Sequence, residues 1–307
     1  MPRIVSLIPS ATEIVHRLGL TDALVGRSHE CDYPVQVKNL PICTEPKFNP
    51  EGTSQEIHDR VTNLLQSALS VYRVKTDVLE ELQPTHILTQ AQCEVCAVSL
   101  ADVEQAVGTL VSSQPQIISL QPNRLSELWT DLDRVASAFG ISAVALTADL
   151  QTRIDFCVEK TRLLSAAERP MVACIEWIEP LMAAGNWIPE LVNLAGGQSL
   201  FGTVGQHSPW LKWEDLIQAN PEAIVIMPCG FDLERTVQEA RTLQQHPDWA
   251  TLRAVQTDRV YVTDGNQYFN RPGPRLVDSL EILAEILHPN RFSFGYKGHG
   301  WRRFGDR

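Results

Sequence analysis

The sequence predicts an α/β protein with two αβ lobes, each with a mainly parallel sheet, joined by one long rigid helix. Short β-branched and apolar runs alternate with helical patterns, which is typical of parallel sheets. A long periodic run over Thr147 to Glu168 separates two such series. The chain has 307 residues, a length that suits two medium domains better than one core.

The first lobe is expected over residues 1–146. A strand over residues 3–8 ends at Pro9, and the capping-box pattern Ser10 to Glu13 predicts the start of a helix that Gly19 ends. Further strands are predicted over 23–26, 85–89 and 116–120, with helices over 56–71 and 100–110 between them.

The linker helix is expected over residues 147–169, because apolar positions keep one face until Pro170 stops the pattern. At 1.5 Å per residue it would span about 30 Å. The second lobe follows over 170–289, with strands at 171–176, 223–227 and 260–263 and a last helix at 274–287. The basic, aromatic tail over 290–307 is expected to be disordered, with a docking strip as the alternative.

Composition excludes several classes of protein. The net charge of −11 argues against a nucleic-acid partner, because phosphate binding needs clustered Lys and Arg. No apolar run is long enough to cross a bilayer, so membrane insertion is not expected. The N-terminus lacks the apolar stretch of a secretory leader, which predicts a cytoplasmic protein, or a periplasmic one if a leader was removed.

Motifs of common catalytic sites are missing from the sequence. It contains no G-x-S-x-G, no P-loop and no HExxH, and no glycine-rich phosphate loop follows a predicted strand. We therefore interpret the chain as a binding protein rather than an enzyme, with no cofactor required for catalysis.

Polar and aromatic side chains follow the predicted strands at their carboxyl ends. In open parallel sheets ligands bind there. Aromatic rings would give a large flat ligand apolar faces, and polar groups would orient it. The side chains expected to bind ligand on this ground are Glu176, Trp177, Trp187, Asp264, Asn266, Tyr268 and Phe269.

A cysteine pair supports two alternative functions. Cys93 and Cys96 form a CxxC, whose spacing suits a thiolate pair on one metal ion or a redox dithiol. A zinc or iron site needs further ligands, and Cys31, Cys229 and His29 are the candidates. The alternatives are therefore direct binding of zinc or iron, and a thiol oxidoreductase that uses Cys93 and Cys96.

Five segments together resemble the cobalamin-type substrate-binding proteins of ABC importers, a class that also takes up siderophores, haem and metals. They are RIVSLIPSATEIVHRLGL at the start, CDYP, LQPTHILTQ, PEAIVIMPCG and DGNQYFNRPGPRLVDSLEILAEI near the end. The resemblance spans about residues 3 to 289 and implies two αβ lobes, a rigid connecting helix and a ligand cleft between the lobes. It also implies cobalamin or a related corrinoid or metal chelate as ligand, and a transporter permease as partner.

By motif position, the resemblance assigns further residues to the ligand: Pro9, Ser10, Tyr33, Gln90 and Arg271, together with Asp264 and Tyr268. Gln90 departs from the family pattern, in which a tryptophan is expected. The CxxC and the His-Glu-Cys-Asp run that begins at His29 are also outside that pattern. These departures keep the direct metal site open as an alternative.

Overall fold

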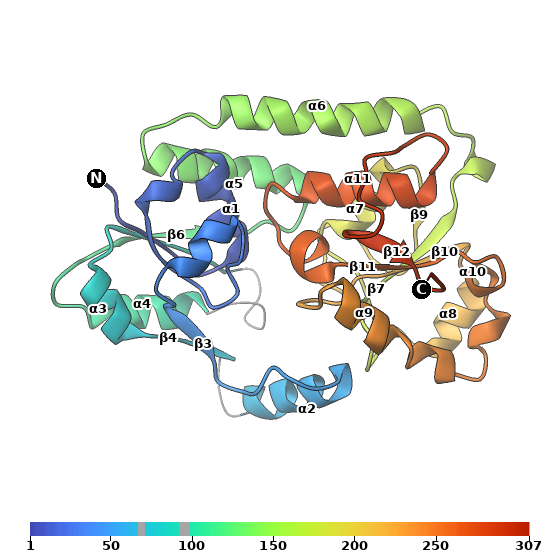
Figure 1. Cartoon of the computed structure of the whole chain (residues 1–307), viewed down its shortest axis with the longest axis horizontal. Coiled ribbons are helices and arrows are strands. Elements are labelled where there is room, and N and C mark those ends of the chain that lie inside the picture. The colour runs from blue at the N-terminus through green and yellow to red at the C-terminus, as the bar shows by residue number, and fades with distance from the viewer. Residues whose placement is uncertain (67–70, 92–98, 307) are drawn as a thin grey trace. The chain divides into compact units, whose positions relative to one another are not determined.

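The computed structural model describes residues 1–66, 71–91 and 99–306. They divide into two compact units. The first comprises Met1–Gly52, Glu56–Pro122 and Ser126–Thr147, and the second comprises Thr53–Gln55, Asn123–Leu125 and Ala148–Arg307. Figure 1 shows the helices and strands of both units.

The first unit is built on a parallel sheet with the strand order β2-β1-β5-β6. Its strands are β1 (Ile4–Ser6), β2 (Leu24–Arg27), β5 (His86–Gln90) and β6 (Gln116–Leu120), and β3 (Thr44–Pro46) pairs with β4 (Tyr72–Val74) in a small antiparallel sheet. The helices of this part of the chain are α1 (Pro9–Arg17), α2 (Ser54–Leu65), α3 (Thr76–Leu82), α4 (Leu100–Gly108) and α5 (Leu125–Ala138).

The second unit contains a six-stranded mixed sheet. Strands β11 (Val260–Thr263), β10 (Ala223–Ile226) and β7 (Met171–Trp177) are parallel at its centre. Strand β9 (Gln198–Ser199) is parallel to β7, whereas β12 (Trp301–Arg303) and β8 (Met182–Ala183) are antiparallel edge strands. The helices are α7 (Ile188–Leu194), α8 (Trp213–Ala219), α9 (Leu233–Ala240), α10 (Arg253–Gln256) and α11 (Leu276–Leu287).

Helices cover both faces of this second sheet. Ile224 and Ile226 of β10 belong to a core cluster that includes Leu216 of α8 and Leu233 of α9. The alternate residue Val225 is also fully buried, and α7 packs against α11 on that other side (Figure 1). Strands buried on both faces read as continuous apolar runs. This is why the sequence predicts β10 and β11 closely.

The connecting helix is shorter than predicted. Helix α6 runs over Val144–Thr161 and crosses the boundary between the units, which lies after Thr147. It ends before residue 168 because Ser165 and Glu168 form a capping box that starts a separate 3-10 helix, Ala166–Glu168. Arg169 also donates a hydrogen bond to the carbonyl of Thr161, at 2.7 Å, and satisfies the end of α6.

The predicted start of α1 is also wrong. Pro9 is the first residue of the helix and Ile8 is its N-cap, without a side-chain cap. Proline suits this position because its missing N–H would have no partner in the first turn. Ser10 and Glu13 therefore lie inside the helix, where both are buried, and do not form a capping box.

The part of the tail that the structure describes, residues 290–306, is ordered rather than disordered. Strand β12 pairs with β11, so that Trp301 lies opposite Thr263, and the Trp301 side chain is buried. Phe292 is buried as well. Apolar burial and ladder hydrogen bonds thus offset the entropy of ordering this segment. Among the helices of the described residues, none is long and apolar enough to span a membrane.

Candidate functional site

The loop over residues 264–271 follows β11 and is tightly hydrogen-bonded. Asp264 caps it: one carboxylate oxygen accepts the backbone N–H of Gln267 at 2.7 Å, and the other accepts the side-chain amide of Gln267 at 2.7 Å. Burial raises the pKa of Asp264, and the hydrogen bonds from Gln267 oppose that rise. The carboxylate therefore orders the loop in addition to its expected part in ligand binding.

The same loop is tied to the end of the neighbouring strand β10. The side-chain amide of Asn270 donates to the carbonyls of Met227 and Gly265, at 2.9 Å each. The backbone N–H of Asn266 donates to the carbonyl of Phe231 at 3.0 Å. Arg271 donates to the side-chain oxygen of Asn266 at 2.9 Å. The structure thus brings Asp264, Asn266 and Arg271 together in one ordered loop.

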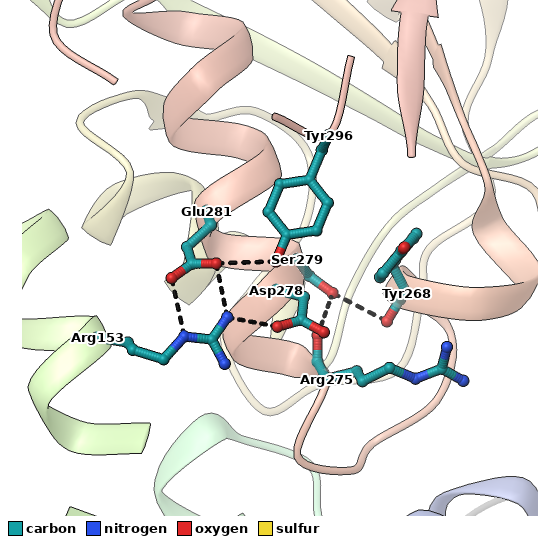
Figure 2. Close-up of polar contacts among 7 residues, drawn as sticks. All are labelled: Arg153, Tyr268, Arg275, Asp278, Ser279, Glu281 and Tyr296. Atoms are coloured by element: carbon teal, nitrogen blue, oxygen red, sulfur yellow. Dashed lines mark hydrogen bonds and ion pairs between the residues drawn. The ribbon is translucent and has the colours of Figure 1, made fainter. Parts of the chain in front are cut away.

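Tyr268 is packed more closely than its place in a polar loop suggests. Only 8% of the residue is exposed. Its carbonyl accepts a hydrogen bond from the hydroxyl of Ser279 at 2.9 Å (Figure 2). The Arg275 guanidinium lies 5.7 Å from the centre of its ring, and the ring of Tyr296 makes an edge contact at 5.8 Å. Removal of the Tyr268 side chain would therefore disturb the fold locally, in addition to any effect on ligand binding.

Two of the predicted ligand-binding aromatic residues have packing roles here. Phe269 is fully buried, at 0% exposure, and Trp187 is buried as well. The indole N–H of Trp187 donates to the carbonyl of Phe269 at 2.8 Å. Buried indoles usually find such a partner. These two rings hold the loop against α7 and present almost no surface to a ligand in this structure.

Glu176 and Trp177 lie at the end of β7 and are partly exposed. Glu176 accepts a hydrogen bond from the hydroxyl of Ser208 at 2.9 Å, and the carbonyl of Glu176 accepts the backbone N–H of Cys229 at 3.2 Å. The rings of Trp177 and Phe231 are 5.4 Å apart. The carboxyl ends of β7 and β10 therefore carry an aromatic pair beside a carboxylate.

The site residues predicted in the first unit occupy different environments. Pro9 and Ser10 are buried in the first turn of α1, and Gln90 is buried at the end of β5. Tyr33 is exposed, at 39%, and its ring makes an edge contact with His16 at 5.7 Å. Of these four residues, Tyr33 is the one that presents a large surface.

The residues proposed for a metal site are not gathered in the part of the chain that the structure describes. Cys31 is buried, and its sulfur lies 3.0 Å from the hydroxyl of Thr12. Burial first, and then the charges of Arg27 and Lys75, lower the pKa of His29 to about 4. Within the described ranges, no group of three or more His, Cys, Asp or Glu side chains is placed to hold a metal ion.

The remaining candidates for the metal site are Cys229, Cys93 and Cys96. Cys229 belongs to the second unit, whereas Cys31 and His29 belong to the first. Cys93 and Cys96 lie outside the described residues.

Several residues that contact the candidate site, or that are buried in α11, were not predicted from the sequence. Ser208 orients Glu176, and the guanidinium of Arg235 lies 3.8 Å from the centre of the Phe231 ring. Glu281 and Glu285 of α11 are buried although the helix is otherwise apolar. The sequence does contain one signal for Glu281 and Glu285. Two acidic residues four positions apart within an apolar helix lie on the same face, and if that face is buried their carboxylates need hydrogen-bond or ion-pair partners.

Comparison with known proteins gives matches along most of the chain. A model of the family described as Periplasmic binding protein matches residues 4–267. The uncharacterized ABC transporter substrate-binding lipoprotein YvrC of Bacillus subtilis is 24% identical over 297 residues, covering 94% of this chain and 81% of that protein. A vitamin B12-binding protein of Vibrio cholerae serotype O1 is 24% identical over 288 residues, covering 93% and 88%.

A solved structure shows the same fold. The periplasmic heme-binding protein RhuT of Roseiflexus sp. RS-1, in its apo form, matches with a TM-score of 0.70 at 23% identity, covering 94% of this chain and 98% of that one. This likeness confirms the predicted α/β fold class.

The expectation of a cytoplasmic protein is wrong. The matched relatives are a lipoprotein of an ABC transporter and proteins described as periplasmic, which act outside the cytoplasm. The first residues of the sequence misled the interpretation, because the lack of an apolar leader in them says nothing about how the protein is processed or attached.

Proposed function

Because the chain belongs to the periplasmic binding protein family, we propose that it reversibly binds a corrinoid, cobalamin first, and delivers it to the permease of an ABC transporter. The observation that carries the proposal is the ordered loop after β11, where Asp264, Asn266 and Arg271 are held together beside the ends of β7 and β10. The names of the matched relatives support both the ligand class and the transporter partner.

The chemistry of these strand ends suits an amide-edged macrocycle. Trp177 is partly exposed and offers an aromatic face, which the buried ring of Phe231 supports from behind. Asn266 is also partly exposed and offers a hydrogen-bond donor and acceptor to peripheral amides, while the buried Arg271 holds its side chain in place. A preformed loop also lowers the entropy lost on binding.

The acidic groups nearby favour a corrin over a porphyrin that carries free carboxylates. Glu176 lies near the end of β7, whereas Asp232 and Asp264 follow the neighbouring strands β10 and β11. An additional negative charge beside these carboxylates is unfavourable. Arg235 and Arg271 offset part of this negative charge. An uncharged amide edge avoids the repulsion altogether.

Titration of the purified protein with cyanocobalamin tests the proposal, with hemin titrated in parallel. We expect cobalamin to bind with a Kd in the micromolar range or tighter, about −8 kcal/mol or more favourable. Trp177→Ala should weaken binding by about 1–3 kcal/mol, the usual range for an aromatic contact residue. Phe156→Ala is the matched control, because Phe156 is an exposed aromatic residue of α6 and should leave affinity unchanged.

The other possible outcomes of these titrations would change either the ligand or the site. Binding of hemin without cobalamin would replace the corrinoid by haem within the same ligand class. Binding of neither compound at tens of micromolar would reject a tetrapyrrole-type chelate as the ligand. Equal effects of Trp177→Ala and Phe156→Ala would reject the site at the strand ends of the second unit.

A further inference from the structure

The C-terminal segment over residues 295–303 is held on α11 by a buried carboxylate. Glu285 is 6% exposed. One of its oxygens accepts the backbone N–H of Gly295 at 3.1 Å, and the other accepts the backbone N–H of Tyr296 at 3.2 Å and the indole N–H of Trp301 at 3.0 Å. Such hydrogen bonds to a charged group are stronger than neutral ones, so this carboxylate fixes the path of the segment.

A second buried carboxylate, one helical turn earlier, holds the side chain of Tyr296. The hydroxyl of Tyr296 donates to Glu281 at 2.9 Å (Figure 2). The other oxygen of Glu281 accepts from the guanidinium of Arg153 at 2.9 Å, and Arg153 is also paired with Asp278. Burial first, and then the charges of Asp278 and Glu281, raise the pKa of Tyr296, so the phenol remains a donor at neutral pH.

The same segment contacts the loop over 264–271 at two points. The ring of Tyr296 meets that of Tyr268 edge to face, with centres 5.8 Å apart and planes at 80°. The carbonyl of Gly300 accepts the backbone N–H of Asp264 at 3.0 Å. Space is tight here, since a Cβ at Gly300 would lie 3.4 Å from the ring of Tyr268. The loop is therefore bounded by the C-terminal segment on this side.

We propose that Tyr296 is a positioning residue for ligand binding: clamped by Glu281 and Glu285, it holds Tyr268 and with it the loop over 264–271 in the conformation that binds ligand. This inference rests on the proposed function for its effect on affinity, whereas its effect on the loop is independent of any ligand. The C-terminal segment thus has a part in binding although none of its residues needs to touch the ligand.

Two readouts on the full-length protein test the inference. Hydrogen–deuterium exchange of the peptide that covers residues 264–271 reports the order of the loop without ligand. Titration with cyanocobalamin reports affinity. Tyr296→Ala should speed exchange in this peptide, with little change in β7, and should raise the Kd about tenfold, which corresponds to about 1.4 kcal/mol.

Two further variants separate positioning from general destabilisation. Tyr296→Phe keeps the ring and the backbone hydrogen bond to Glu285 but loses the hydrogen bond to Glu281, so its exchange and affinity should lie between those of the wild type and those of Tyr296→Ala. Lys297→Ala is the control, because this exposed neighbour pairs with Asp306 at 3.7 Å and should change neither readout.

The outcomes distinguish this inference from the proposed function. Unchanged exchange over 264–271 in Tyr296→Ala would overturn the inference, whatever the ligand does. Faster exchange with unchanged affinity would overturn the link between the segment and binding. Faster exchange in a protein that binds no cobalamin would reject the corrinoid and leave the positioning of the loop supported.

Discussion

Replacement of Arg153 by Met should destabilise the second unit. Arg153 comes from α6 and donates to two carboxylates of α11, Asp278 and Glu281. Met has a similar length and keeps the apolar packing of the side chain, but it removes the positive charge. Without Arg153, the negative charges of Asp278 and Glu281 would lie close together without the cation that neutralises them. Glu281 would keep the hydrogen bond from the Tyr296 hydroxyl.

The size of the effect follows from burial. Removal of one partner of a buried ion pair costs about 3–5 kcal/mol, because the other charge stays buried without compensation. Here the Arg153 side chain keeps 26% of its exposure and Asp278 keeps 18%, so water solvates part of the remaining charge. We therefore expect a loss of about 2–3 kcal/mol in the free energy of unfolding. With a urea dependence of about 2 kcal/mol per molar, the midpoint falls by about 1 M.

Urea unfolding followed by tryptophan fluorescence measures this loss, because six of the seven tryptophans lie in the second unit. Arg162→Met is the matched control, because this exposed arginine follows α6 directly. It should change the free energy of unfolding by less than about 0.5 kcal/mol. Adding Glu281→Gln to Arg153→Met should recover about half of the loss, because one uncompensated charge is gone. A midpoint within error of the control, or no recovery in the double variant, would refute the reasoning.

Three further predictions concern single sites. Gly265→Ala should cost about 1–3 kcal/mol of unfolding free energy in urea titration, because its Cβ would lie 2.2 Å from the carbonyl oxygen of Pro228. Trp187→Phe should cost about 1 kcal/mol, since it removes the hydrogen bond to the Phe269 carbonyl. Burial raises the pKa of Asp131 from 3.8 to about 6, so the folded state binds more protons between these values and the unfolding free energy falls as pH rises through them, by up to about 3 kcal/mol. Asp131→Asn should flatten this slope when unfolding is followed by circular dichroism from pH 4 to 7, and an unchanged slope would contradict the assignment.

The sequence predicted the central strands of the second sheet well, but it did not predict the edge strand β12 at the C-terminus. Strand β11 has the predicted bounds, and β10 ends one residue earlier than predicted, because residues buried on both sheet faces form short apolar runs between loops. Strand β12 was missed because its residues are Trp301, Arg302 and Arg303, which show no alternation. An edge strand needs only one buried side chain, so its pattern is weak.

The candidate site was predicted where it depends on local sequence. Asp264, Asn266 and Arg271 follow one strand, so their proximity comes from a single loop. The roles of Phe269 and Trp187 were not predictable in this way. Which face of the loop is buried depends on Trp187, the N-cap residue of α7, which lies 82 residues before Phe269 and donates the hydrogen bond to its carbonyl.

The buried acidic residues of α11 show that a sequence can indicate a need for hydrogen-bond donors without indicating which residues supply them. Glu281 and Glu285 lie in the apolar run Leu280 to Leu287, and a carboxylate is seldom buried unless it is paired. The pattern therefore requires donors elsewhere, yet it cannot say which, because Arg153 is 128 positions away and Trp301 is 16. Since both acids are committed to these donors, neither is free to serve a ligand or a transporter. Their requirement for partners is instead what makes the C-terminal segment an integral part of the second unit.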